Sequence, residues 1–500
     1  MVVIFAMYVG YHMFFQEEDK TQPEVMPVKK ERTTATDLRI GILKYDSINP
    51  ILSQNRNVQE IARLVFEPLI QLTEDFQLES ALAKEWSKLD DTHYIIKLNN
   101  KAKWQDGYSF DADDVIFTVN RIKQTKKKSI YYYNVENIKE IKKVDEYTLK
   151  ITLKEKEPYF EYNLIFPIMS SKYFDESSFT SASKNKNPVG TGMYYIAEKT
   201  DNHIMLKPNV SWWQEKNVKI DTIQINIYRG MDEALEAFKD RNVDLITSSN
   251  ATIEDYLKDE QYQKAEVINR NYQCLVFNCK DATLKNKQVR QAIANSIDQQ
   301  AIVKSVFHNK YKESYFPLDF GCYLYHTSNQ TNKMSGKEIK KQLKTKLTLQ
   351  LLVNNDDQEA LKVADKIQKQ LSKVKVTVKI QAKEKEEYQA SIKERNYEMA
   401  LINKNYAYSP SLYSYFGNGN VSNYQSKEMQ QLLRKLENTE EEEEATNIVS
   451  QIKVLYDKEV PCVGLYYDTI TMLYSNSLRG SVTPTSYNLF YHMEDWYREY

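Results

Sequence analysis

Residues 277–298 read FNCKDATLKNKQVRQAIANSID, and they are the most informative stretch of the chain. Within this stretch Val289, Ile293 and Ile297 recur at the spacing of one helix face, which predicts a helix over residues 288–306. This helix is one of several that alternate with strand-like segments, and that alternation decides the fold class.

Outward from this stretch, helices and strands alternate without a repeat period. Strands are predicted where β-branched and aromatic residues alternate with polar ones, and helices where apolar residues recur every three or four positions. The predicted strands are 38–43, 93–98, 147–153, 220–228, 347–353 and 374–380, and the predicted helices are 57–67, 111–122, 231–241, 288–306, 358–371 and 428–456. The five glutamates 440–444 within the last are either a solvated helix face or a loop between two helices. The mixture predicts an α/β protein of mixed α+β character.

The composition is that of an ordinary globular protein. Of the 500 residues, 41% are hydrophobic and 27% are charged, and 68 basic side chains nearly cancel 69 acidic ones. The length predicts more than one compact unit, because single cores stop growing at roughly 250–300 residues. A balanced charge argues against nucleic acid as a partner.

Three further segments combine turn residues with strand or helix ends. Trp104-Gln105-Asp106-Gly107 is a turn, and Asp111-Ala112-Asp113-Asp114-Val115 opens a helix with carboxylates at its positive end. Pro188 to Tyr194 reads PVGTGMY and places two of only 12 glycines together, which indicates a tight backbone requirement. Asn242-Val243-Asp244 follows the helix 231–241.

These segments, in this order, resemble the bacterial extracellular solute-binding proteins of family 5, the oligopeptide, dipeptide and nickel type that serves ABC importers. The opening stretch matches most specifically, with an asparagine after a strand at Asn278, then Val289-Arg290-Gln291-Ala292-Ile293, then Ile297-Asp298. The resemblance covers the chain from about Asp37 to the C-terminus.

The resemblance implies a two-lobed periplasmic-binding-protein-like fold with a hinge. We expect a first lobe over 37–270 that includes an extra subdomain at about 66–186. A second lobe is expected over 271–469, and residues 470–500 are expected to return to the first lobe. Closure of the hinge around the ligand is the expected motion.

The resemblance also implies reversible capture of oligopeptides or a related ligand for the permease subunits of an ABC importer. The expected ligand-binding residues are Gly190, Thr191 and Gly192 at the lobe interface, Asn278 near the hinge, and Tyr406 and Tyr408 opposite them. The two tyrosines either contact the ligand or merely pack in the second lobe.

One departure from the family pattern concerns the ligand. Peptide-binding members usually carry an aspartate shortly before a proline in the second lobe, where it pairs with the ammonium group of the peptide. The corresponding residues 403–410 read NKNYAYSP and contain no acid. Since an enclosed charge needs a partner, recognition of a free peptide N-terminus is in question.

The N-terminus predicts attachment to the membrane. Residues 1–15 read MVVIFAMYVGYHMFF, without a charge, and an acidic segment follows. We expect a signal anchor over 1–20, a polar tether over 21–36, and a monomeric domain on the extracytoplasmic face of the bacterial cytoplasmic membrane. The alternative is a buried N-terminal helix of a soluble protein.

Enzymatic function is not expected. The six histidines form no H-E-x-x-H pair, and neither G-x-S-x-G nor a Walker sequence occurs, so we predict no catalytic residue, metal or cofactor. The alternative function is a membrane-anchored ligand sensor or envelope scaffold of the same fold that is not coupled to transport.

Overall fold

A computed structural model describes residues 34–499 except 176–178, 182, 251–252, 258–260, 327–333 and 344. The expected anchor over 1–20 and nearly all of the expected tether over 21–36 lie outside this part. No helix in the described ranges has both the length and the apolar character that a membrane span needs.

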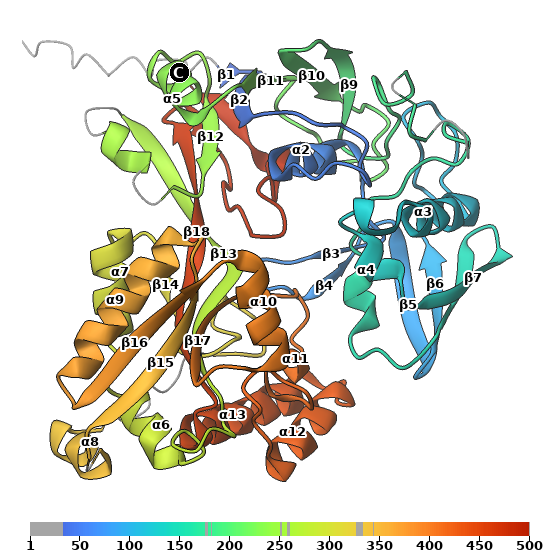
Figure 1. The fold of residues 1–500 in the computed structure, drawn as a ribbon. Coiled ribbons are helices and arrows are strands. Elements are labelled where there is room, and N and C mark those ends of the chain that lie inside the picture. The colour runs from blue at the N-terminus through green and yellow to red at the C-terminus, as the bar shows by residue number, and fades with distance from the viewer. Residues whose placement is uncertain are drawn as a thin grey trace, which may run out of the picture.

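Two lobes are joined along one eleven-stranded sheet, and two long strands run from one lobe into the other (Figure 1). These strands are β13 (Tyr262–Phe277) and β18 (Cys462–Ser475), which pair antiparallel. Their register shifts between the Ile268–Thr469 pair and the Tyr272–Tyr467 pair, so Asn269, Arg270 and Asn271 oppose Asp468 alone. This bulge divides the strand pair into one half for each lobe.

Lobe I contains the half of β13 that precedes the bulge and the half of β18 that follows it, together with the strands beside them, the covering helices and the C-terminal segment. Its core strand β2 pairs parallel with β11 and β12, as expected of strands that are connected through helices. Its elements are β1 (Thr34–Ala35), β2 (Asp37–Leu43), α2 (Arg56–Val65), β9 (Tyr194–Lys199), β10 (His203–Pro208), β11 (Thr222–Tyr228), α5 (Met231–Lys239), β12 (Leu245–Ser248), β19 (Leu478–Arg479) and β20 (Tyr497–Glu499).

A buried carboxylate holds the strands of lobe I together and accounts for the Asn242-Val243-Asp244 motif. The Asp244 carboxylate accepts hydrogen bonds from the guanidinium of Arg39 on β2 at 2.9 Å. It also accepts one from Arg498 on β20 at 3.0 Å. Because the carboxylate is buried, both arginines are needed to offset the cost of its desolvation.

The extra subdomain is a four-stranded sheet of order β5-β6-β8-β7 with its own hydrophobic core, seen to the right of the lobes in Figure 1. Its elements are β5 (Ala83–Asp90), β6 (His93–Leu98), α3 (Ala112–Thr125), α4 (Tyr132–Val135), β7 (Ile138–Asp145) and β8 (Thr148–Leu153). The hairpin of β3 (Ile70–Leu72) and β4 (Leu78–Ser80) precedes it. The expected limits at 66 and 186 stay a prediction.

One fully buried side chain, Asp114, connects the turn 104–107 of the subdomain with the helix that begins after Asp111. Its carboxylate accepts from Trp104 Nε1 at 2.9 Å, from the backbone N–H of Asp111 at 3.1 Å and from the backbone and hydroxyl of Ser171, both at 2.7 Å. Burial raises the pKa of Asp114, although these hydrogen bonds oppose the shift. The tryptophan and the helix N-terminus are therefore parts of one packing unit.

Lobe II lies on the other side of the bulge. Its elements are α6 (Lys287–Ala294), α7 (Gln299–Phe307), β14 (Lys312–Glu313), α8 (Gly336–Gln342), β15 (Leu347–Asn354), α9 (Gln358–Ser372), β16 (Val376–Lys383), α10 (Lys385–Glu394), β17 (Met399–Asn405), α11 (Tyr413–Phe416), α12 (Lys427–Glu437) and α13 (Glu442–Glu459). Strands β15, β16 and β17 are parallel neighbours, and β17 pairs antiparallel with β13.

One helix prediction in lobe II was wrong, and a second segment adopts the two-helix alternative. The predicted helix 288–306 is two helices, because Asp298 caps α7 by accepting from the backbone N–H of Ala301 at 3.0 Å. The predicted helix 428–456 is also two helices, with Asn438 as the C-cap of α12. The glutamates 442–444 form the first turn of α13, where the positive end of the helix dipole stabilises them.

The Gly-Thr-Gly motif packs against the end of α2. The backbone N–H of Gly192 donates to the carbonyl of Val65 at 2.9 Å, and that of Gly190 donates to Gln105 Oε1 at 2.9 Å. A Cβ on Gly190 would lie 1.8 Å from the Val65 carbonyl oxygen. The tight backbone requirement predicted for the two glycines is confirmed, because their backbone lies directly against the last turn of α2.

Gly190→Val should therefore destabilise lobe I severely. We expect a loss of more than about 3 kcal/mol in unfolding free energy, because the backbone of α2 has to move to admit the side chain. Gly336→Val is the matched control, since a Cβ on Gly336 meets nothing within 4 Å. Thermal unfolding followed by circular dichroism checks this, and equal melting of the two variants would contradict it.

Candidate ligand-binding cleft

A cleft of about 1630 Å³ lies between the two lobes. Its volume exceeds the range of about 300–1,000 Å³ usual for small-molecule pockets. Lining residues come from lobe I and the subdomain (segments 54–63, 130–136, 155–165 and 486–487), from the bulge (269–271), and from lobe II (405–414 and 434–438). Because both lobes contribute, their relative position sets the shape of the site.

The bulge presents amide side chains to the cleft. Asp468 on β18, opposite the bulge, accepts from Asn269 Nδ2 at 3.0 Å and from Asn271 Nδ2 at 2.9 Å. Burial raises the pKa of Asp468, and the two amides oppose that shift. Asn269 Oδ1 in turn accepts from Arg56 at 2.8 Å, which ties the bulge to α2. The crossing strands thus place polar groups on the floor of the cleft.

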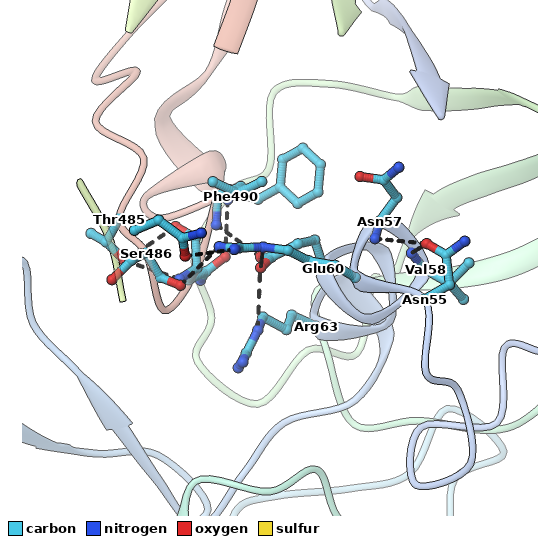
Figure 2. Close-up of polar contacts among 12 residues, drawn as sticks. Asn55, Asn57, Val58, Glu60, Arg63, Thr485, Ser486 and Phe490 are labelled. Carbon is cyan, nitrogen blue, oxygen red and sulfur yellow. Dashed lines mark hydrogen bonds and ion pairs between the residues drawn. The ribbon is translucent and has the colours of Figure 1, made fainter. Parts of the chain in front are cut away.

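The face of α2 that lines the cleft carries charged side chains (Figure 2). Asn55 caps the helix by accepting from the backbone N–H of Asn57 at 2.9 Å. Glu60 lies between Arg56 and Arg63, with nitrogen–oxygen distances of 3.8 Å to each. It also accepts from the backbone N–H of Leu489 at 2.9 Å, so the C-terminal segment is held against α2.

Tyr408 connects lobe II with lobe I at the inner end of the cleft. Its hydroxyl donates to the carbonyl of Ser486 at 2.7 Å. Its ring stacks on Phe76 at 5.6 Å between centroids and meets Tyr487 edge-on at 5.4 Å. Burial raises the pKa of Tyr487 to about 12, so the Tyr487 hydroxyl is neutral at physiological pH.

The subdomain also contacts lobe II, at the end of the cleft lined by residues 155–159 and 434–438. Lys156 donates to Asn438 Oδ1 at 2.8 Å, and the hydroxyl of Tyr159 donates to the carbonyl of Leu436 at 3.1 Å. Glu157 is fixed by the amides of Asn137 and Asn163 at 2.8 and 2.6 Å. The half-buried Glu437 has its pKa raised by desolvation.

The six residues expected to bind ligand lie in separate places. Tyr408 lines the cleft. The other five are not among its lining residues. Tyr406 is 2% exposed and packs between Phe320 and Tyr415. Asn278 donates to the carbonyl of Tyr397 within lobe II. Gly190, Thr191 and Gly192 lie beside α2. Ligand contact by any of the six stays a prediction.

The cleft contains arginines that the sequence analysis missed. Arg56, Glu60 and Arg63 stand at positions i, i+4 and i+7, which share one helix face, so the periodicity contained the signal. Arg270 had no such signal, because its exposure depends on the bulge. Among the described residues, no group of three or more His, Cys, Asp or Glu side chains is placed to hold a metal ion.

Comparison with known proteins gives the family. A profile described as "Bacterial extracellular solute-binding proteins, family 5 Middle" matches residues 77–425. Heme-binding protein A of Haemophilus influenzae is 24% identical over 459 residues, which cover 83% of this chain and 83% of that protein. Dipeptide-binding protein DppE of Bacillus subtilis is 23% identical over 478 residues, with 87% of each covered.

The fold matches solved structures over nearly the whole chain. The periplasmic murein tripeptide-binding protein MppA, in its unliganded open form, superimposes with a TM-score of 0.85 at 18% identity and covers 94% of this chain and 99% of its own. The family consists of substrate-binding proteins rather than enzymes, and a cleft between two lobes is the structure that such binding uses. The chain belongs to the bacterial extracellular solute-binding proteins, family 5.

Proposed function

We propose that the solute is a short peptide or a peptide-like molecule, captured in the cleft and delivered to the permease subunits of an ABC importer. The lining of the cleft carries this proposal. Neutral hydrogen-bonding side chains line it from the bulge (Asn269, Asn271) and from lobe II (Asn405, Ser409, Ser411). Amides and hydroxyls both donate and accept, which suits the alternating N–H and C=O groups of a peptide.

The apolar part of the lining supports the same ligand class. Ile130 and Tyr133 from the subdomain and Tyr413 from lobe II line the cleft and are 44%, 58% and 40% exposed. Large apolar groups exposed on two facing walls favour a ligand with side chains of its own. Two relatives whose names specify dipeptide and murein tripeptide binding also support a peptide.

The proposal includes a place and a form for the protein. We place the folded part, from about residue 37, on the extracytoplasmic face of the membrane as a monomer. Residues 1–20 anchor it and 21–36 form the tether, which the uncharged run 1–15 supports. The lobe boundaries near 270 and 469 belong to the same proposal, and the bulge at 269–271 opposite Asp468 supports them.

The full chain, purified without unfolding, should carry peptides. Native mass spectrometry is expected to show a family of bound masses, which denaturation releases as peptides of several sequences. A protein that is empty and shows no thermal shift with a mixed tripeptide-to-pentapeptide pool would contradict the peptide proposal. So would the release of a single non-peptide compound.

Tyr408→Ala should weaken binding of that pool by about tenfold or more, because a partly buried aromatic side chain of the cleft and a link between the lobes are both lost. Tyr195→Ala is the matched control, since Tyr195 is a partly exposed tyrosine of β9 that does not line the cleft. Isothermal titration calorimetry on both variants measures the difference. Equal affinities would remove Tyr408 from the site.

A further inference from the structure

The inner end of the cleft is positively charged. Three arginines line it there, Arg56 and Arg63 from α2 and Arg270 from the bulge. Glu60 is the lining carboxylate that faces them, at 3.8 Å from both Arg56 and Arg63. The carboxylate of Asp468 on β18 binds Asn269 and Asn271 and also interacts with the charge of Arg56, but it is not among the lining residues. The arginines therefore outnumber the acids of this end.

The three arginines converge on one small group of residues. The Arg63 guanidinium lies 4.1 Å from the ring centre of Tyr487, and that of Arg270 lies 4.3 Å from the ring centre of Tyr408. Those two rings touch edge to face at 5.4 Å. Arg56 donates to the carbonyl of Ser486, the same oxygen that the Tyr408 hydroxyl binds. The arginines are thus neighbours although they come from distant parts of the chain.

The arginines retain donors for a ligand. A guanidinium carries five N–H groups. Arg270 Nη1 donates to the carbonyl of Tyr406 at 3.0 Å. The ion pair of Arg63 Nε with Glu60 is too long for a hydrogen bond at 3.8 Å, so this buried nitrogen has no hydrogen-bond partner among the described residues. A guanidinium stacked on an aromatic ring keeps its edge available, and the edge is the part that binds a carboxylate with two parallel hydrogen bonds.

The other end of the cleft has the opposite charge. Glu136, Glu155 and Glu157 from the subdomain and Glu437 from α12 line it. The basic side chains there are Lys156 and Arg434, and Lys156 is engaged by Asn438 and by Asp91 at 3.4 Å. Acids therefore outnumber bases at this end. The cleft has a positive and a negative end, joined by the neutral amides and hydroxyls between them.

We infer that the cleft binds a zwitterionic peptide in one direction, with its free C-terminal carboxylate on Arg56, Arg63 and Arg270 and its ammonium group at the end lined by Glu136, Glu155, Glu157 and Glu437. This inference rests on the proposed function and adds the direction and the required end group. The segment 403–410 contributes no acid to the inner end, and Glu60 there already lies between Arg56 and Arg63, so an ammonium group would meet an excess of positive charge.

The test compares three pools of the same tripeptides to pentapeptides, with free ends, with amidated C-termini and with acetylated N-termini, on the full chain by isothermal titration calorimetry. Amidation should weaken binding at least tenfold, as expected for loss of charge-assisted hydrogen bonds. In the double variant Arg63→Gln, Arg270→Gln the free and amidated pools should bind alike. Acetylation should still weaken binding to that variant.

Arg229→Gln, an exposed arginine outside the cleft, should keep the full preference for free carboxylates. Arg270→Gln alone serves as the second variant if the double variant melts below the wild type. Equal binding of free and amidated pools by the wild type overturns the inference and leaves the peptide proposal standing. A preference for free over amidated peptides that survives in the arginine variants also overturns the inference. Failure of the wild type to bind any pool overturns both.

Discussion

The structure depends on the pairing of β13 with β18. Each strand is longer than an ordinary strand of about 5–6 residues, and each supplies one half to each lobe. The two lobes thereby share one sheet without sharing one rigid core. At the crossing, three residues of β13 oppose Asp468, and the ladder is interrupted there. An interrupted ladder is the place where a sheet bends at the lowest cost.

The same interruption builds the site. In a regular strand, successive side chains would alternate between the two faces of the sheet, and the backbone would be fully paired with the neighbouring strand. The bulge instead frees Asn269, Arg270 and Asn271, and Asp468 orients the two amides. Arg56 and Tyr408 then reach this point from the two lobes. Hinge and binding site therefore use the same few residues, so a ligand at the inner end contacts the parts that change when the lobes move.

Local chemistry predicted much of the fold. His93–Leu98 is a strand with the expected bounds, and Asp111 caps the helix that the acidic pattern indicated. The break at Asp298 was missed because apolar residues recur on both sides of it, while the capping side chain decides the outcome. The break near Asn438 was left open, since residues 437–444 contain no apolar side chain. The family motifs mark packing points: Asp114 is a buried acceptor, and Gly190 and Gly192 allow α2 to approach.

The site was harder to predict because it is assembled from distant segments. Of the six candidates, Tyr408 lines the cleft, whereas its neighbour Tyr406 faces the core of lobe II. The sequence places the two residues alike, and tertiary packing alone separates them. Arg56 and Arg63 were visible as one helix face, yet their importance follows from Tyr487 and Arg270, which are hundreds of residues away. The arginines are therefore the basis of the peptide orientation that we infer for this cleft, whose segment 403–410 contains no acid.

Hydrogen–deuterium exchange of the full chain, with and without the tripeptide-to-pentapeptide pool, tests the central claim that one ligand is bound between the two lobes. The account predicts slower exchange on both walls at once, in segments 54–63 and 486–487 of lobe I and 405–414 of lobe II, together with the bulge at 269–271. Protection confined to one lobe, or protection outside these segments alone, would contradict it.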